Sequence, residues 1–259
     1  MPPIKQLLKA VTPEWLLHLR RKLVIASLRR SFGELSRQEA FSRIYSDNFW
    51  GRAAAGHWSS GSGSVGRAAE AYKELICRFV EEHGITSVVD LGCGDFRIGA
   101  SIAKAVHTYI GVDVVPELVG ELRSRFGSPT VEFLCLDIVD DNLPLGQLCL
   151  VRQVLQHLSN EEIRRIIPKL ACYKWVLVTE HYPAPGRPVS PNKDKPHGPD
   201  TRVIDDSAVF LDEPPFGLSG IREVLQVETE SFQVAPGEVI RTFLIAGSSL
   251  ANAEMEAAH

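Results

Sequence analysis

Two glycines and an aspartate have the types and the spacing of a ligand-binding site. Gly92-Cys93-Gly94-Asp95 follows a short apolar run, and Asp113 ends a second such run 19 residues after Gly94. Glycine lets the backbone turn tightly and leaves no side chain where a ligand must approach. A carboxylate at the end of the next strand can accept hydrogen bonds from a ribose diol. The pattern therefore predicts a site for a ligand that contains a ribose.

Three residues farther along the chain are candidates for acid–base catalysis. His157 and His181 follow two later apolar runs, and Glu180 stands next to His181. Histidine is the usual general base near neutral pH, so either imidazole could remove the proton of a hydroxyl. His157 also fits a core-facing side chain that closes a turn, and His181 fits a structural role equally well. Glu180 could orient an imidazole, but adjacent side chains on a strand point to opposite faces.

The elements that carry these residues alternate between strands and helices. Strands are expected at 86–91, 109–113, 131–136, 147–151 and 174–179, and helices at 67–83, 97–106, 116–126 and 159–170. This alternation predicts βαβ units and a parallel sheet with helices on both faces. A hairpin is expected over 221–229 and 238–246. Ligands of such sheets bind beyond the carboxyl ends of the strands, which brings the glycine loop and both histidines to one edge.

The glycine spacing separates two classes of ligand that share this geometry. A dinucleotide site needs a third glycine in G-x-G-x-x-G, and that position is Arg97 here. The chain instead resembles the class I S-adenosylmethionine-dependent methyltransferases over about residues 67–182. Four segments at strand ends carry the resemblance: 88–95 (VVDLGCGD), 110–113 (IGVD), 136–138 (LDI) and 150–158 (LVRQVLQHL).

The resemblance implies a Rossmann-like α/β fold with a seven-stranded sheet, mostly parallel, that ends in an antiparallel hairpin. It also implies S-adenosyl-L-methionine as the cofactor and assigns each part of it to residues at the sheet edge. The methionine portion falls to Asp90, Gly92, Cys93 and Gly94, the ribose to Asp113, the adenine to Asp137 and Ile138, and the sulfonium side to Arg152 and Gln153. For Asp137 a turn cap is the alternative interpretation.

A helical extension over 1–64 is expected to precede the methyltransferase domain, 65–250. Thr12-Pro13-Glu14 is typical of a helix start, and residues 1–40 carry a net charge of +5 against −9 in the remainder. We expect this basic helix to pack on the core or on a second copy in a homodimer. Weak association with a membrane surface is the alternative.

Two loop segments are expected near the substrate. The glycine- and serine-rich tract at 48–64 has the composition of a flexible linker, but Trp50 and Trp58 also suit a lid over a binding site. The proline-rich insertion at 183–216 is too long for a simple connection and is expected to form the substrate wall. Its polar side chains expected to face an acceptor are His197, Asp200, Arg202, Asp205 and Asp206. The tail, 251–259, is expected to fray.

Composition excludes several classes of function. The 259 residues carry a net charge of −4, which argues against a nucleic-acid binder. No apolar run reaches the roughly 18–20 residues of a transmembrane helix. Five cysteines without paired metal-ligand spacing indicate reduced thiols in a cytoplasmic protein. No metal site is predicted, because the spacing of His181, Asp205 and Asp206 is not diagnostic.

We therefore predict methyl transfer to a small-molecule or saccharide acceptor, at a hydroxyl. The segment 45–64 and Pro214-Pro215-Phe216 resemble methyltransferases of bacterial polysaccharide and sugar pathways, which favours a sugar hydroxyl. Methylation of an amine or of a protein is one alternative. A catalytically silent cofactor-binding subunit that docks a partner through the basic helix is another.

Overall fold

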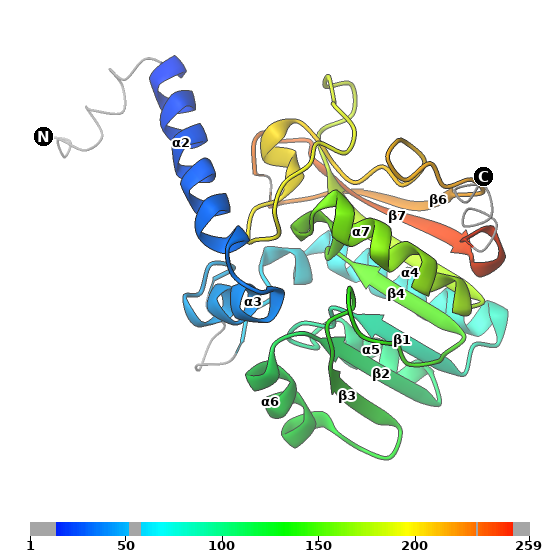
Figure 1. The fold of residues 1–259 in the computed structure, drawn as a ribbon. Helices are drawn as coiled ribbons and strands as arrows, with labels where there is room; N and C mark the ends of the chain where they lie inside the picture. The colour runs from blue at the N-terminus through cyan, green and yellow to red at the C-terminus, as the bar shows by residue number, and fades with distance from the viewer. Residues whose placement is uncertain (1–13, 52–57, 232, 251–259) are drawn as a thin grey trace, which may run out of the picture.

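Seven strands form a single sheet at the centre of the chain (Figure 1). The computed structural model describes residues 14–51, 58–231 and 233–250, with side chains from Lys22 onward. The strands are β1 (Ser87–Leu91), β2 (Thr108–Asp113), β3 (Val131–Cys135), β4 (Leu148–Arg152), β5 (Trp175–Tyr182), β6 (Arg222–Glu228) and β7 (Val239–Ala246). Their order is β3-β2-β1-β4-β5-β7-β6. The first five pair in parallel, and β7 runs antiparallel to β5 and β6, which confirms the predicted fold.

Helices cover both faces of the sheet. On one face, α4 (Arg67–His83), α5 (Gly99–Ile102) and α6 (Pro116–Phe126) pack against side chains such as Val88 and Leu150. On the other, α7 (Asn160–Ile166) packs against Val89 and Val151. Because both faces are covered, β4 is buried at four consecutive positions, as parallel central strands are.

The helix expected at 97–106 is interrupted. The α-helical part, α5, begins only at Gly99 and is followed by the 3-10 turn η3 (Ala103–Ala105); Phe96, just before the expected helix, has a φ of 61°, outside the helical region. The Phe96 ring is buried against Tyr109 and Phe133, with ring centroids 5.3 and 4.9 Å away. The helix expected at 159–170 likewise changes after α7 into the 3-10 turn η5 (Ile167–Cys172).

Two α-helices in the described residues precede α4: α2 (Glu14–Gly33) and α3 (Arg37–Ser46). In Figure 1, α2 projects away from the body, and Leu23 and Val24 are 64% and 59% exposed. Its carboxyl end is anchored, because Phe32 is buried with residues of α3. Packing on a second copy or a membrane surface stays a prediction. No helix in the described residues is long and apolar enough to cross a bilayer. The expected helix start at Thr12-Pro13 and the tail, 251–259, lie outside those residues.

Candidate active site

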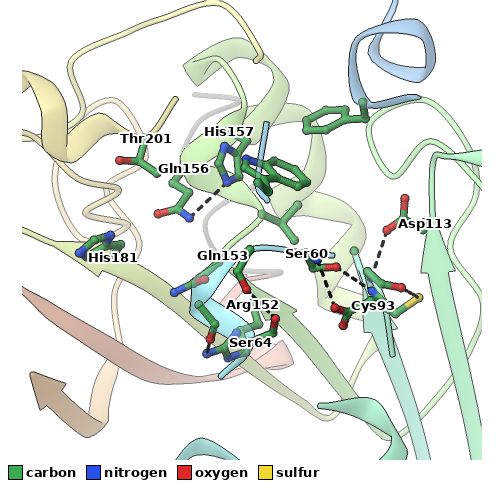
Figure 2. Close-up of a pocket in the computed structure, with 18 of the residues that line it drawn as sticks. Ser60, Ser64, Cys93, Asp113, Arg152, Gln153, Gln156, His157, His181 and Thr201 are labelled. Atoms are coloured by element: carbon green, nitrogen blue, oxygen red, sulfur yellow. Dashed lines mark hydrogen bonds between the residues drawn. The ribbon is translucent and has the colours of Figure 1, made fainter. Parts of the chain in front are cut away.

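A pocket lies beyond the carboxyl ends of the parallel strands (Figure 2). Figure 2 shows Asp113 and Cys93 at one end and His181 and Thr201 at the other. All the residues predicted to hold the cofactor line this pocket, as do both candidate histidines. The residues predicted from the sequence therefore lie in one pocket. The contacts of each side chain show what role it can have there.

The glycine loop folds back against β2. The amides of Gly92 and Cys93 both donate to the carbonyl oxygen of Val112, over 2.8 and 3.0 Å. Gly92 and Gly94 have φ of 76° and 54°, a left-handed conformation that favours glycine. A Cβ on Gly94 would lie 2.3 Å from the Ser60 hydroxyl oxygen, which is closer than atoms can pack. Both glycines are therefore required by the shape of the loop.

Two buried carboxylates stand behind this loop. Asp113 accepts hydrogen bonds from the amides of Gly94 and Val115, each over 3.1 Å, and burial raises its pKa to about 6. Asp90 accepts a 2.6 Å hydrogen bond from the Tyr109 hydroxyl, and burial raises its pKa to about 6 as well. A carboxylate has about four acceptor sites, so Asp113 keeps capacity for the hydroxyls of a ligand.

Asp137 is a turn cap that also lines the pocket. One of its oxygens accepts from the Val139 amide over 2.9 Å, and the other accepts from Arg37 Nε over 2.7 Å. Arg37 comes from α3, and its Nη1 also pairs with Glu162 Oε1 at 3.0 Å. Sequence reasoning missed α3, although Ser36 and Glu39 form a capping box that marks its start.

The described part of the glycine- and serine-rich tract covers the glycine loop. The Ser60 hydroxyl accepts from the Asp95 amide over 2.7 Å, and the Ser60 amide donates to the Asp95 carboxylate over 3.2 Å. Arg152 Nη2 donates to the Gly63 carbonyl oxygen over 2.6 Å. Gln153, at a φ of 55°, also reaches this tract, since a Cβ on Gly63 would lie 1.9 Å from its Oε1. Whether the tract opens and closes as a lid stays a prediction.

His157 has the structural role that was its alternative interpretation. Its Nδ1 donates to the Gly198 carbonyl oxygen over 3.1 Å, and its Nε2 lies 3.3 Å from Gln156 Nε2. Burial, helped by the positive charge of Lys195, lowers the pKa of His157 to about 4. The ring also packs against Trp50, with centroids 5.0 Å apart. His157 is therefore a neutral wall of the pocket and a weak base.

Glu180 does not orient an imidazole. Its carboxylate accepts from the amides of Val154, Leu155 and Gln156 over 2.9–3.2 Å and so closes the 3-10 turn η4 (Leu155–His157). Glu180 is not among the described residues that line the pocket.

The carboxylate beside His181 is Glu238 instead. His181 Nε2 lies 2.9 Å from Glu238 Oε2, at the entry to β7. Glu238 is 1% exposed and accepts from the amides of Gln233, Val234 and Ala235 over 2.7, 2.7 and 3.0 Å. Burial raises the pKa of Glu238, but the His181 contact and these amides outweigh it and bring the pKa to about 2. The sequence held no signal for this pair, because only the pairing of β5 with β7 brings the two residues together.

The substrate wall is built differently from the expectation. In the 183–216 insertion, Pro199 and Thr201 line the pocket, whereas the five polar side chains expected there have partners elsewhere. Those partners are Glu162 for His197, Arg29 for Asp200 and Asp205, Arg187 for Asp206, and two backbone carbonyl oxygens for Arg202. Within the described residues no group of three or more His, Cys, Asp or Glu side chains could hold a metal ion.

Comparison with known proteins shows what kind of domain contains the glycine loop. Residues 88–173 match the family model described as a methyltransferase domain. These residues therefore form a methyltransferase domain, as the resemblance to the class I S-adenosylmethionine-dependent methyltransferases implied. The pocket fits S-adenosylmethionine, since the glycine loop and the carboxylates at the ends of three neighbouring strands, Asp90, Asp113 and Asp137, line it. No curated protein matches the chain.

Several solved methyltransferase structures are similar in fold. The N-methyltransferase NodS from Bradyrhizobium japonicum WM9 is 14% identical, over 69% of this chain and 96% of that chain, with a TM-score of 0.47. Magnesium protoporphyrin IX methyltransferase (ChlM) from Synechocystis PCC 6803, with bound SAM, is 18% identical, over 69% of this chain and 80% of that chain, with a TM-score of 0.43. A putative S-adenosylmethionine-dependent methyltransferase from Listeria monocytogenes is 18% identical over 68% of this chain and 98% of that chain, with a TM-score of 0.45. Likeness at this level says nothing about the acceptor of this chain.

Proposed function

We propose that this methyltransferase methylates a hydroxyl oxygen of a neutral, polyhydroxylated small molecule or glycan. The observation that carries the proposal is His181, an imidazole in the pocket wall with a buried carboxylate against one of its nitrogens. A hydroxyl is a weak nucleophile and needs a positioned base to take its proton, whereas a neutral amine does not. A base of this kind therefore favours an oxygen acceptor.

For the cofactor, we propose the roles that the family resemblance assigns. Asp90 and the loop from Gly92 to Gly94 would hold the methionine portion, Asp113 the ribose hydroxyls, and Asp137 with Ile138 the adenine. Arg152 and Gln153 would border the sulfonium. When bound, S-adenosylmethionine supplies an electrophilic methyl group. The protein then has to align the acceptor oxygen with it and remove the proton.

The acceptor end of the pocket supports a neutral acceptor. Its walls are an indole ring, amides and hydroxyls, contributed by Trp50, Gln156, Thr201, Thr229, Ser231 and Gln233. Such groups exchange hydrogen bonds with sugar hydroxyls but provide no charge to balance a phosphate or a carboxylate. The two arginines among the described pocket residues are engaged by protein groups, Arg37 by Asp137 and Arg152 by the Gly63 carbonyl oxygen.

The test is transfer of labelled methyl from S-adenosylmethionine to panels of neutral sugars and glycosides, of sugar phosphates and of amines. We expect transfer to neutral hydroxyl compounds. We also expect His181→Gln to lower kcat by about 10²–10⁴-fold while the affinity for S-adenosylhomocysteine, measured by calorimetry, stays within about threefold. His107→Gln, at an exposed histidine, is the matched control. Transfer only to amines, or full activity of His181→Gln, would contradict the proposal.

A separate titration tests the cofactor site. S-adenosylhomocysteine should bind the wild type, NAD should not, and Asp113→Ala should lose the binding, because the carboxylate that both shapes the loop and would hold the ribose is gone. Binding of NAD, or full affinity in Asp113→Ala, would overturn the assignment of the glycine loop.

A further inference from the structure

We infer that Glu238 is a positioning residue for the base: it fixes His181 in the tautomer whose Nδ1 is free to take the acceptor's proton, and it ties that base to residues 229–231 and 233–237 on the acceptor wall. This inference rests on the proposed function. Glu238 itself is fully covered and is not among the described residues that line the pocket, so it acts only through its neighbours.

Three backbone amides donate to the Glu238 carboxylate and hold it as an ionised acceptor that faces His181. Oε1 accepts from the amides of Val234 and Ala235, and Oε2 accepts from the Gln233 amide and faces His181 Nε2. A backbone amide keeps its hydrogen and can only donate. The imidazole is the one neighbour in this set that can adapt to the carboxylate.

The chemistry of the pair then sets the tautomer. A carboxylate only accepts hydrogen bonds, so the ring nitrogen that faces it must carry hydrogen, and in a neutral histidine the other nitrogen is then unprotonated. Among the described residues, no group hydrogen-bonds to His181 Nδ1. The Nε2–H is close to the oxygen but not aligned with it. Catalytic hydrogen bonds often align only when the substrate is bound.

The free nitrogen gives the reaction its proton acceptor. The hydroxyl proton of the acceptor would pass to Nδ1 as the acceptor oxygen takes the methyl group, and the electron pair of the broken S–C bond would stay on the sulfur of the cofactor. The resulting imidazolium lies against the Glu238 carboxylate, which stabilises its positive charge. Removing that charge should therefore slow the chemical step more than it weakens cofactor binding.

The same carboxylate organises the acceptor wall. By accepting the Gln233 amide, Glu238 fixes the start of the turn that leads into β7, and the Gln233 side chain accepts from the Thr201 hydroxyl over 2.9 Å. Thr229 and Ser231 of the same loop also line the pocket. Glu238 therefore holds both His181 and the acceptor wall in place.

The variant Glu238→Gln separates this role from simple loop support. At the position of Oε1, the new NH2 group would face two amide donors, those of Val234 and Ala235. At the position of Oε2 it faces one amide donor, that of Gln233, and the His181 imidazole, which can change tautomer. The amide therefore places its NH2 toward His181, whose Nε2 must then accept and whose Nδ1 must carry hydrogen. A carboxylate-to-amide change of this kind beside a catalytic histidine leaves geometry intact and blocks the base.

The experiment is 15N NMR of the imidazole nitrogens in protein saturated with S-adenosylhomocysteine, with the His181 signals assigned by their loss in His181→Gln. We expect Nε2–H in the wild type and Nδ1–H in Glu238→Gln, and no change in Glu223→Gln, a surface glutamate paired with Arg241 on the neighbouring strand. With the acceptor from the screen, Glu238→Gln should lower kcat by at least about 10²-fold with cofactor affinity within about threefold.

Two outcomes would overturn the inference: an Nδ1–H tautomer in the wild type, or an unchanged tautomer and kcat in Glu238→Gln. The wild-type measurement does not depend on whether the variant folds. The tautomer measurement also needs no acceptor, so a screen without any hydroxyl acceptor would refute the proposed function alone.

Discussion

Arg29 is expected to be the main anchor of α2, and Arg29→Ala tests this. Its Nε donates to Asp200 Oδ2 over 2.9 Å, and its Nη2 pairs with Asp205. The Asp200 side chain is only 2% exposed, and its other cation, Lys195 Nζ, is 3.6 Å away, beyond a good hydrogen bond. Removing the guanidinium would leave this buried carboxylate with only the longer Lys195 ion pair.

The cost follows from the burial of the two charges. Removing one partner of a buried ion pair costs about 3–5 kcal/mol. The Arg29 side chain is 20% exposed, so we take the lower end, about 3 kcal/mol. For a domain of this size that corresponds to a fall in Tm of about 6–12 °C. Arg30→Ala changes the next residue on the same helix, which is exposed, and should stay within about 0.5 kcal/mol of the wild type.

Urea denaturation followed by circular dichroism, with scanning calorimetry for Tm, measures both variants. If Arg29→Ala and Arg30→Ala unfold within about 0.5 kcal/mol of each other, the reasoning is refuted, because the ion pairs then contribute no more than surface charges do. A functional consequence is also expected. Asp200 lies between Pro199 and Thr201, which both line the pocket, so Arg29→Ala should raise KM for the acceptor more than it changes cofactor affinity.

Two further predictions concern the glycine loop and the pH dependence of folding. Gly94→Ala should weaken S-adenosylhomocysteine binding at least about tenfold in calorimetry, because a Cβ there clashes with the Ser60 hydroxyl and the φ of residue 94 is positive. Gly120→Ala is the control and should bind normally, because a Cβ there meets nothing within 4 Å. Equal affinities would contradict the clash. The hydrogen bond from His197 to Glu162 raises the pKa of His197, so its stabilisation is complete below the ordinary value of 6.5 and is lost as pH rises through the raised pKa. The free energy of unfolding should therefore fall more between pH 6 and 9 in the wild type than in His197→Gln, and parallel urea curves would argue against this.

The sequence predicted the parts of the chain whose signals are local. Strands buried on both faces read as short apolar runs, and α4 and α6 were bounded correctly by a glycine stop and a proline start. The same kind of signal was present for α3 in Ser36 and Glu39 but was overlooked. The late start of α5 at Gly99 had no such signal in the sequence.

The partners of charged side chains could not be predicted, because they lie far apart in the sequence. Asp200 and Asp205 looked free for a substrate, yet Arg29 reaches them across more than 170 residues. Glu180, adjacent to His181, looked like its partner, whereas strand pairing brings Glu238 there. Composition and spacing identify which side chains can do chemistry, and only the register of the sheet decides which of them meet.

The two ends of the pocket lie in different parts of the chain. The family match, 88–173, contains the glycine loop and the strand ends that face the cofactor. The proposed acceptor end consists of Trp50, His181, Thr201, Thr229, Ser231 and Gln233, which all lie outside that match. Its segments are also held by contacts specific to this chain, such as the pairing of Glu238 with His181. Substitutions that change the acceptor should therefore fall in these segments, and those that change cofactor affinity should fall within the matched region.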